Sequence, residues 1–492
     1  MVTDKPSPKA GTGLRAVREN GWRMADAGTA ASPRTASLIH LAFAGPLRRT
    51  VPAIFRGTTR IPIHSLAAFR ILFGLLMMAA MLRFMANGWV DELFLRPQFH
   101  FPYPGFEWIR PWPGAWLHWH VATTAACALG VAIGYHYRIC SVLFFLGFTW
   151  LELIDRTIYL NHYYLVSLVA GLMVFMLAHR AWSLDAARKR SLRSDFIPAW
   201  PVNLLRFQFA IVFLFAGVAK LNADWLLEAQ PLRIWLAARS DLPLIGPLLE
   251  QKWVAYVASW FGAAYDLSVP FLLLCSRSRP LAFVAVVFFH VLTGLLFPIG
   301  MFPWIMIAGA TLFFPPDWPS RNIRAPEART DALPAWGKWL LATYVAAQIF
   351  IPMRGWFYES NSAWSGEGFN WAWKVMIVEK RGAVDFTARD GNKSWRIDPR
   401  EYLTARQVVM MAQDPYLIRA FVRHLADDLR KRGHREIEIR TDAFVTLNGR
   451  PSQRIIDPHV DLAGPLKPGW IVPDSSRDHP RDPVIRACSR GQ

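Results

Sequence analysis

The feature that most constrains this chain is a series of apolar windows, each close to the length that crosses a lipid bilayer. They lie at 65–85, 115–134, 139–154, 163–179, 202–220, 254–275, 281–297, 302–314 and 338–352. Windows of this kind are typical of membrane helices. We therefore predict a polytopic α-helical membrane protein with about nine spans, of which 302–314 is short enough to be re-entrant.

The composition agrees with a membrane location. Of the 492 residues, 53% are hydrophobic and 14% aromatic, and the mean hydropathy is +0.19. The net charge is +19, and the basic residues lie in the N-terminal tail and in loops between the windows. This distribution indicates membrane topology. We expect membrane lipid and no nucleic acid as a partner. The four cysteines form no CxxC pair and no Cys/His metal spacing, so no metal site is predicted.

The basic loops predict the orientation of this multi-pass protein. Arginine and lysine gather before the first window, between the fourth and fifth, and after the sixth, and such loops favour the cytoplasmic side. The N-terminus is therefore predicted to be cytoplasmic. The expected domains are a basic cytoplasmic tail at 1–60, a transmembrane domain at 61–353, an extracytoplasmic domain at 354–473 and a flexible tail at 474–492.

After residue 373 the pattern changes to that of a small α+β domain. Alternating runs predict strands, and apolar residues at helical spacing predict helices. The expected strands are 373–378, 384–388, 436–447 and 452–456, and the expected helices are 403–412 and 415–432. Asn448 and Gly449 are typical of a tight hairpin turn. The C-terminal region is therefore predicted to be a C-terminal α+β extracytoplasmic domain.

One lysine stands out at the end of the fifth window. Lys220 follows about twenty apolar residues and precedes a polar turn that contains Asp224 and Trp225. A lysine there can anchor the helix end in the membrane interface, or burial can make its amine a base. Asp224 is expected to face elsewhere or to bind backbone donors.

Two further charges lie inside apolar windows. Arg70 is in the first window and Asp266 is in the sixth, and both are predicted to lie in the cytoplasmic half at similar depth. Charges inside a membrane are costly unless they are paired. We therefore predict a structural ion pair between Arg70 and Asp266. The alternative is that each charge binds separately to backbone groups, water or lipid headgroups.

Several motifs, taken in order, resemble those of the vitamin K-dependent γ-glutamyl carboxylase family, whose membrane part is the HTTM domain. They include 65–74 (SLAAFRILFG), 134–140 (GYHYRIC), 155–165, 179–183, 216–225 (AGVAKLNADW), 289–302, 368–373 and 447–461 (LNGRPSQRIIDPHVD). The resemblance covers roughly residues 61 to 473. Each motif is weak alone, but eight in register are specific, and the chain looks like a bacterial-type member.

The resemblance implies an enzyme without a metal, a carbon–carbon lyase with coupled vitamin K epoxidase activity. Its co-substrates would be a reduced vitamin K-type naphthoquinone, O2 and CO2, and it would carboxylate glutamate in a peptide or protein. Lys220 matches the family's base, and Asn161 and His162 match the pair that serves the quinone and the carboxylation step. Vertebrate members have two consecutive lysines at the base, whereas Ala219 precedes Lys220 here.

An isoprenoid quinone needs an apolar slot that is reachable from the bilayer. Candidate slot residues near the outer ends of spans are His290, Phe297, Met301, Phe302 and Trp304, although such aromatic residues also form ordinary interfacial belts. His290 can equally be satisfied within the helix core. A groove near 369–376, with Trp373 and Met376, is expected to hold substrate.

Three functions remain open from the sequence. The first is a quinone-dependent carboxylase, and the second is a quinone epoxidase of the same family without glutamate carboxylation. The third is a non-enzymatic membrane assembly or transport protein. Transporters often carry internal repeats with broken helices, and we find no such repeat here.

Overall fold

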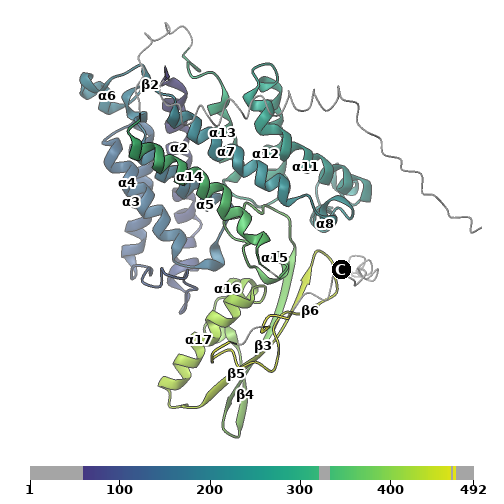
Figure 1. The fold of residues 1–492 in the computed structure, drawn as a ribbon. Coiled ribbons are helices and arrows are strands. Elements are labelled where there is room, and N and C mark those ends of the chain that lie inside the picture. Colours follow the sequence, from purple (N-terminus) through teal and green to yellow (C-terminus); the bar gives the residue numbers. More distant parts are fainter. Residues whose placement is uncertain (1–58, 321–332, 359, 467–468, 473–492) are drawn as a thin grey trace, which may run out of the picture. The chain divides into compact units, whose positions relative to one another are not determined.

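In a computed structural model of the chain, the structure describes residues 59–320, 333–358, 360–466 and 469–472. The predicted basic tail at 1–60 lies almost entirely outside the described residues, and so does the predicted flexible tail at 474–492. Figure 1 shows the described elements, which are mostly helical up to residue 353 and mixed after it.

A helix occupies every apolar window. The long helices are α2 (His64–Ala86), α3 (Ala115–Ile133), α4 (Tyr137–Leu153), α5 (Asn161–Phe175), α7 (Trp200–Ala219), α11 (Lys252–Leu274), α12 (Arg279–Leu296), α13 (Phe302–Ala310) and α14 (Ala335–Met353). Among the described residues, five of them (α2, α3, α7, α11 and α12) are long and apolar enough to cross a membrane. The helical membrane architecture is therefore confirmed, whereas the count of about nine crossings is not.

Short elements connect these helices. They are β1 (Arg60–Pro62), α6 (Leu184–Arg188), β2 (Phe196–Pro198), α8 (Ala223–Leu226), α9 (Leu232–Ala237) and α10 (Gly246–Leu249). Strands β1 and β2 pair antiparallel, with Ile61 opposite Ile197, and so join the start of α2 to the start of α7. Asn222 caps α8 by accepting a hydrogen bond from the Trp225 backbone N–H, which explains why the chain turns directly after α7.

Helices α7 and α11 pack closely together. Gly217, near the end of α7, makes this approach possible, because a Cβ built there would lie 2.8 Å from Cγ of Leu267 on α11. The close crossing brings the last turn of α7 against the middle of α11. It therefore places Lys220 within reach of groups on α11.

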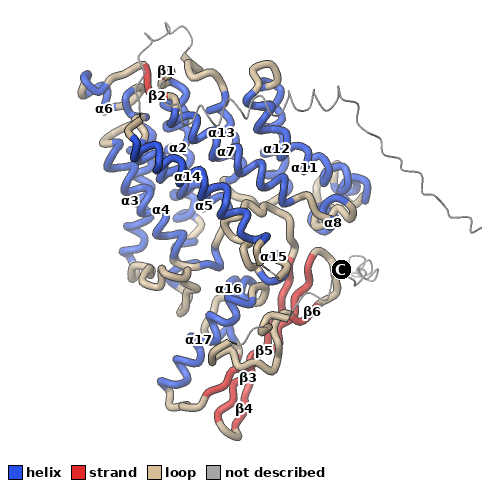
Figure 2. Tube along the Cα trace, in the orientation of Figure 1, coloured by secondary structure: helices blue, strands red, loops and turns tan. Residues whose placement is uncertain are grey.

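The C-terminal domain (residues 354–472) contains a four-stranded antiparallel sheet. Its strands are β3 (Lys380–Asp390), β4 (Lys393–Ile397), β5 (Ile437–Leu447) and β6 (Gln453–Arg454), in the order β4-β3-β5-β6 (Figure 2). Its helices are α15 (Ser362–Ser365), α16 (Ala405–Met411) and α17 (Pro415–Lys431). Apolar side chains of α17, including Phe421 and Leu425, pack on the sheet around Phe386 and Ile439. The predicted α+β character is thus confirmed.

One predicted strand is wrong. Residues 373–378 form an irregular loop rather than a strand. Trp371, Trp373 and Met376 have φ values of 59°, 54° and 54°, which lie in the left-handed region that extended strands exclude. The alternating apolar residues instead point to different surroundings, because Trp373 is buried in the helical core while Ile377 packs against a separate cluster around Trp225. We call residues 373–378 the connecting loop.

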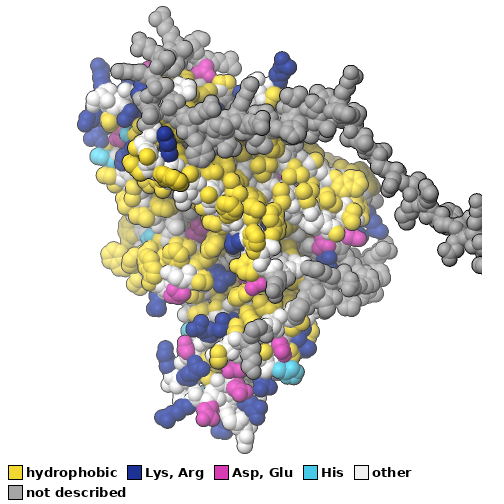
Figure 3. Space-filling model, in the orientation of Figure 1, with side chains coloured by type: hydrophobic (Ala, Val, Ile, Leu, Met, Phe, Trp, Pro, Cys, Tyr) yellow, Lys and Arg dark blue, Asp and Glu magenta, His cyan; other side chains and the backbone are white. Residues whose placement is uncertain are grey.

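The two regions differ in surface chemistry. Hydrophobic side chains cover much of the helical region, whereas Lys, Arg, Asp and Glu gather on the C-terminal domain (Figure 3). Exposed apolar residues such as Leu281, Leu295 and Trp339 are 69–75% exposed on the helices. Such surfaces suit contact with lipid for the helical region and with water for the C-terminal domain.

Candidate active site

Lys220 is buried despite its place at a helix end. It caps the C-terminus of α7, and the whole residue is only 5% exposed. Its amine donates a hydrogen bond of 3.2 Å to the Ala216 carbonyl and lies 5.1 Å from the centre of the Trp225 ring. A snorkelling lysine would extend its amine towards water. The side chain of Lys220 instead turns back along its own helix.

The partner of this buried amine is Asp266. The Lys220 Nζ atom lies 2.7 Å from Oδ2 of Asp266, in the middle of α11, and both side chains are less than 8% exposed. A pair this close and this well enclosed interacts strongly, because little water screens it. The site therefore contains a lysine and a carboxylate that share a hydrogen bond away from bulk water.

The predicted ion pair between Arg70 and Asp266 is therefore wrong. The Arg70 guanidinium donates a hydrogen bond of 2.5 Å to the Trp182 carbonyl, in the turn before α6. Equal depth does not make two charges neighbours, since α2 packs on α3 whereas α11 packs on α7 and α12. Side chains on helices also lean towards the N-terminus, which carries the Lys220 amine back to the depth of Asp266.

The Lys220–Asp266 pair forms one wall of an apolar cavity of about 130 Å³. The other walls come from α7, α11, α12, α13 and the connecting loop. Four residues predicted to bind quinone or substrate line this cavity, namely His290, Phe297, Phe302 and Met376. Phe213, Phe261 and Phe289 also line it, and sequence reasoning missed them because each has the ordinary appearance of a core residue.

His290 is oriented by its own helix. The residue is 1% exposed, and its Nδ1 atom lies 2.9 Å from the Val286 carbonyl. A carbonyl only accepts, so in a neutral ring the proton is on Nδ1 and Nε2 is an acceptor. Phe213, Phe289 and Phe302 surround the ring at centroid distances of 5.4–6.0 Å. The cavity therefore offers one amine and one imidazole among aromatic side chains.

Asn161 and His162 lie next to this cavity but do not line it. They begin α5, where Asn161 Oδ1 accepts a hydrogen bond of 3.0 Å from the Tyr159 hydroxyl. The Phe302 ring lies between the two histidines, with its centroid 6.1 Å from that of His162 and 5.8 Å from that of His290. The Phe302 side chain thus lies between His290, in the cavity beside Lys220, and the Asn161–His162 pair.

Three predicted residues have other surroundings. Trp373 is 1% exposed and stacks on Tyr164 at 4.9 Å, within the helical core. Met301 packs against that core next to α13, and Trp304 is 51% exposed on α13. None of the three lines the cavity beside Lys220. Their positions fit core packing for Trp373 and Met301 and a surface position for Trp304.

The C-terminal domain is fastened to the turn that follows Lys220. Both terminal guanidinium nitrogens of Arg450 donate hydrogen bonds of 2.6 Å to the Asp224 carboxylate, and the Asn448 amide donates a further bond of 2.8 Å to it. The same amide donates to the Ile377 carbonyl at 3.3 Å. Asn448 therefore connects the turn after α7 to the connecting loop, which carries Met376 over the cavity.

A second link joins the domain to the loop before α5. Gln407 donates hydrogen bonds of 2.8 Å to the Phe99 carbonyl and to the Asp155 carboxylate. Burial raises the pKa of Asp155, which also accepts hydrogen bonds from Thr157. The C-terminal domain thus contacts the turn after α7 through Asn448 and Arg450, and the loop before α5 through Gln407.

Apolar spanning helices, a C-terminal α+β domain and an enclosed lysine–carboxylate pair together define an integral membrane protein with a candidate active site near the ends of its spans. A family model described as the HTTM domain matches residues 59–318, and one described as the vitamin K-dependent gamma-carboxylase lumenal domain matches residues 334–474. The chain belongs to the vitamin K-dependent gamma-carboxylase family.

The two matches cover consecutive parts of the chain. The lumenal description indicates that the C-terminal region is extracytoplasmic. No solved structure matches the chain. In the part of the chain that the structure describes, no group of three or more His, Cys, Asp and Glu residues is placed to hold a metal ion.

Proposed function

We propose that this chain couples the oxidation of a reduced vitamin K-type naphthoquinone by O2 to the addition of CO2 to glutamate in a peptide or protein. The observation that carries the proposal is the Lys220 amine, which is buried in an apolar cavity and held 2.7 Å from Asp266. Membership of the gamma-carboxylase family supports an enzyme of this class.

The residues present suit a naphthoquinone ring. The cavity beside Lys220 is lined mainly by aromatic and aliphatic side chains, and its polar groups are the Lys220–Asp266 pair, His290 and Thr293. A flat aromatic ring with one or two hydroxyl groups needs this combination of apolar walls and a few directed polar groups. Phe297, Phe302 and Met376 would hold the ring. When bound, the reduced quinone and O2 would supply the strong base that removes a γ-proton from glutamate.

Lys220 would accept the first proton. A proton can pass along the 2.7 Å hydrogen bond from Nζ of Lys220 to the Asp266 carboxylate, which leaves a neutral amine beside a carboxylic acid. The lone pair of that amine is then free to receive a proton at Nζ from a hydroxyl in the cavity. Asp266 in this scheme holds the proton that Lys220 gives up, so that Nζ has a lone pair when the hydroxyl is bound.

His290 and the Asn161–His162 pair would act around this centre. The Nε2 acceptor of His290 would orient a hydroxyl in the cavity through a hydrogen bond. Asn161 donates to the Lys374 carbonyl at 3.4 Å and so supports the connecting loop. His162, on the other side of Phe302, would serve the carboxylation step, as the family resemblance implies.

The C-terminal domain would hold the glutamate-containing substrate through its sheet edge or a groove near the connecting loop. Its attachment through Asp224 and Asn448 supports this role, because it fixes the domain beside the end of α7. A chain that ends near Pro352 should lose peptide modification while its helical core remains. Normal modification by the truncated chain would contradict this role.

The proposed activity has two products, so one experiment measures both. Candidate glutamate-containing peptides are co-expressed with the chain, and mass spectrometry searches for a glutamate that is heavier by one CO2. Quinone epoxide is assayed in the same membranes. Epoxide without carboxylated peptide would favour a quinone epoxidase of the same family, and neither product, with a reduced quinone supplied, would contradict an enzyme of either kind.

A further inference from the structure

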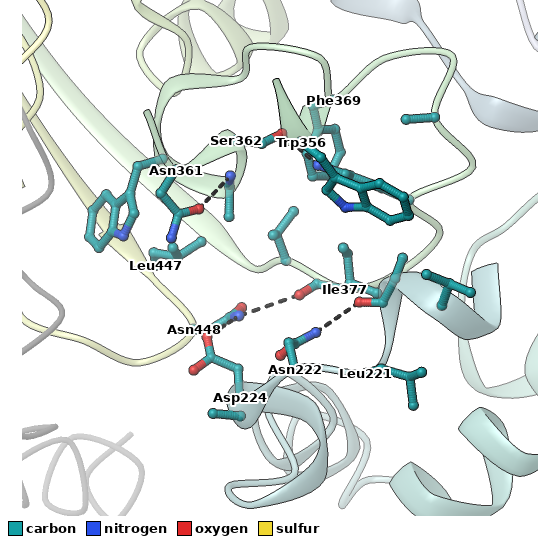
Figure 4. A pocket seen from close by; sticks show the side chains of 18 of the residues that line it. Leu221, Asn222, Asp224, Trp356, Asn361, Ser362, Phe369, Ile377, Leu447 and Asn448 are labelled. Atoms are coloured by element: carbon teal, nitrogen blue, oxygen red, sulfur yellow. Dashed lines mark hydrogen bonds between the residues drawn. The ribbon is translucent and has the colours of Figure 1, made fainter. Parts of the chain in front are cut away.

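A second and larger hollow lies on the other side of the α7 end, away from the Lys220–Asp266 cavity. It has a volume of about 390 Å³ and lies where the outer ends of α7 and α14 meet α15, the connecting loop and the turn after β5 (Figure 4). We call it the junction pocket. It is distinct from the proposed quinone site, and it lies at the connecting loop, near which the proposed function places the glutamate-containing substrate.

Two cations, Lys374 and Arg450, line the junction pocket, and Arg450 is paired with Asp224. The Lys374 amine donates a hydrogen bond of 2.6 Å to the Ser362 hydroxyl and lies 5.4 Å from the centre of the Phe369 ring. Within the described residues, no carboxylate lies within ion-pair distance of this amine. An ammonium has three N–H donors, and one of them is used by Ser362. The other two N–H donors of the half-buried Lys374 amine are therefore available to a ligand or to solvent.

The neighbouring charged side chains already have hydrogen-bond partners. Asp224 and Arg450 neutralise each other in their paired hydrogen bonds on the opposite side of the pocket. The guanidinium of Arg354, behind Lys374, binds the carbonyls of Ile351 and Asn370. Lys374 thus contributes a positive charge that no carboxylate among the described residues balances, and an anion would balance it.

The walls of the pocket differ in polarity. Phe215 and Val218 on α7, with Leu221 just after it, form an apolar wall that Trp356 continues beyond α14. Leu221 and Trp356 are 54% and 61% exposed, at the ends of membrane helices. Asn361 and Ser362 lie on the polar wall (Figure 4), to which Lys374 also belongs. The pocket therefore suits a molecule with one apolar part and one anionic part.

We propose that the junction pocket binds the headgroup of an anionic phospholipid, with its phosphate at Lys374 and its acyl chain along Phe215, Val218 and Leu221. The Asn361 side-chain nitrogen is placed on the same wall and adds a donor for a phosphate oxygen. The lipid would come from the surrounding bilayer, because the apolar wall continues into the outer ends of α7 and α14.

An acidic peptide fits these walls less well. A water-soluble peptide bound by Lys374 would leave Leu221 and Trp356 exposed at the mouth, whereas an acyl chain would cover them. Negative lipid headgroups are also attracted to lysine and arginine near a membrane surface. Charge and polarity together therefore favour a lipid.

The test measures binding and needs no enzymatic activity, so its failure is distinct from failure of the proposed function. The purified full-length chain in detergent is mixed with phosphatidylglycerol or with phosphatidylcholine of the same acyl chains, and native mass spectrometry counts the lipids retained. We expect preferential retention of phosphatidylglycerol. Lys374→Gln should lower its affinity about tenfold or more, which is typical of losing a hydrogen bond to a charged group.

Three variants sharpen the test. Lys252→Gln changes an exposed lysine at the start of α11 and should leave phosphatidylglycerol binding unchanged. Lys374→Arg keeps the charge and should keep the preference. If Lys374→Gln does not fold, Leu221→Glu puts a negative charge at the exposed mouth instead, and it should repel phosphatidylglycerol more than phosphatidylcholine.

Several results would overturn the proposal. Equal phosphatidylglycerol binding by the wild type and by folded Lys374→Gln would remove Lys374 from the site. Equal retention of the two lipids by the wild type would mean that only the apolar surface binds. If an acidic glutamate-containing peptide requires Lys374 while phosphatidylglycerol does not, the pocket is a peptide site and the lipid proposal fails.

Discussion

Arg450 and Asp224, which are far apart in the sequence, meet through two hydrogen bonds of 2.6 Å. Asp224 is four residues beyond Lys220, and Arg450 is in the turn that follows β5. The side chains are only 20% and 16% exposed. The C-terminal domain is thus attached by a largely buried ion pair close to the candidate active site.

Loss of one partner of this ion pair should loosen the domain. We expect Arg450→Ala to lower the free energy of unfolding of the C-terminal domain by about 3 kcal/mol, because the largely buried Asp224 carboxylate would lose its guanidinium partner. Limited proteolysis and thermal unfolding in detergent would measure this. The control is Arg454→Ala, which breaks a similar but exposed pair with Asp442 and should cost below about 1 kcal/mol. Equal effects of the two changes would contradict the prediction.

Substitutions of Lys220 can show whether this residue acts as a base or as a membrane anchor. If Lys220 accepts a proton, Lys220→Ala should reduce quinone epoxidation and carboxylation together by about 100-fold or more, since the second depends on the first. Lys220→Arg should fail as well, because a guanidinium stays protonated. Both products are measured in membranes that contain equal amounts of inserted protein. Normal activity of Lys220→Arg would identify an interfacial anchor.

Asp266 should matter for stability and activity in different ways. Asp266→Leu alone leaves the Lys220 ammonium buried without its partner and should cost about 3 to 5 kcal/mol. The double change Lys220→Met with Asp266→Leu replaces the pair by apolar side chains, so its melting temperature should recover. Its epoxidase activity should stay absent. A double variant no more stable than Asp266→Leu would argue against a direct pair.

The orientation of the chain is testable at the tip of the β3–β4 hairpin. Asn448 is buried, so a label there would disturb the fold, whereas Lys393 is exposed. In a variant without its native cysteines, Lys393→Cys should react with a membrane-impermeant maleimide added from outside. Reaction only after permeabilisation would place the C-terminal domain in the cytoplasm and reverse the proposed topology.

Lipid binding at the junction pocket should depend on pH. Burial, and then repulsion from Arg354, lowers the pKa of Lys374 to about 8. Lys374 is charged below that pH, so phosphatidylglycerol should bind most tightly there and more weakly as the pH rises. The bound phosphate would itself raise the pKa of Lys374, so the loss should be centred above pH 8. Lys374→Arg should show no such loss between pH 7 and 9.5, because arginine stays charged in about this range. The same decline in that variant would assign the effect to another group.

The sequence by itself determined the helical membrane architecture and most of the C-terminal domain. Apolar length and periodicity are local properties, so each predicted window contains a helix, and strands β3 and β5 follow the predicted alternation. The end of α7 was also recognisable, because Lys220 breaks an apolar run immediately before a polar turn. His290, Phe297 and Phe302, which the sequence suggested for a quinone slot, line the same cavity as Lys220, and so does Met376, which was expected in a separate groove.

Only the tertiary structure decided which charges meet. Asp266 pairs with Lys220 and not with Arg70, because α11 packs on α7 and the lysine side chain leans back along its helix. The connecting loop has left-handed residues where alternation predicted a strand, since Trp373 packs against Tyr164 of α5 rather than against a neighbouring strand. Ion pairs and loop conformations depend on neighbours that are distant in the chain, and local sequence patterns do not record those neighbours.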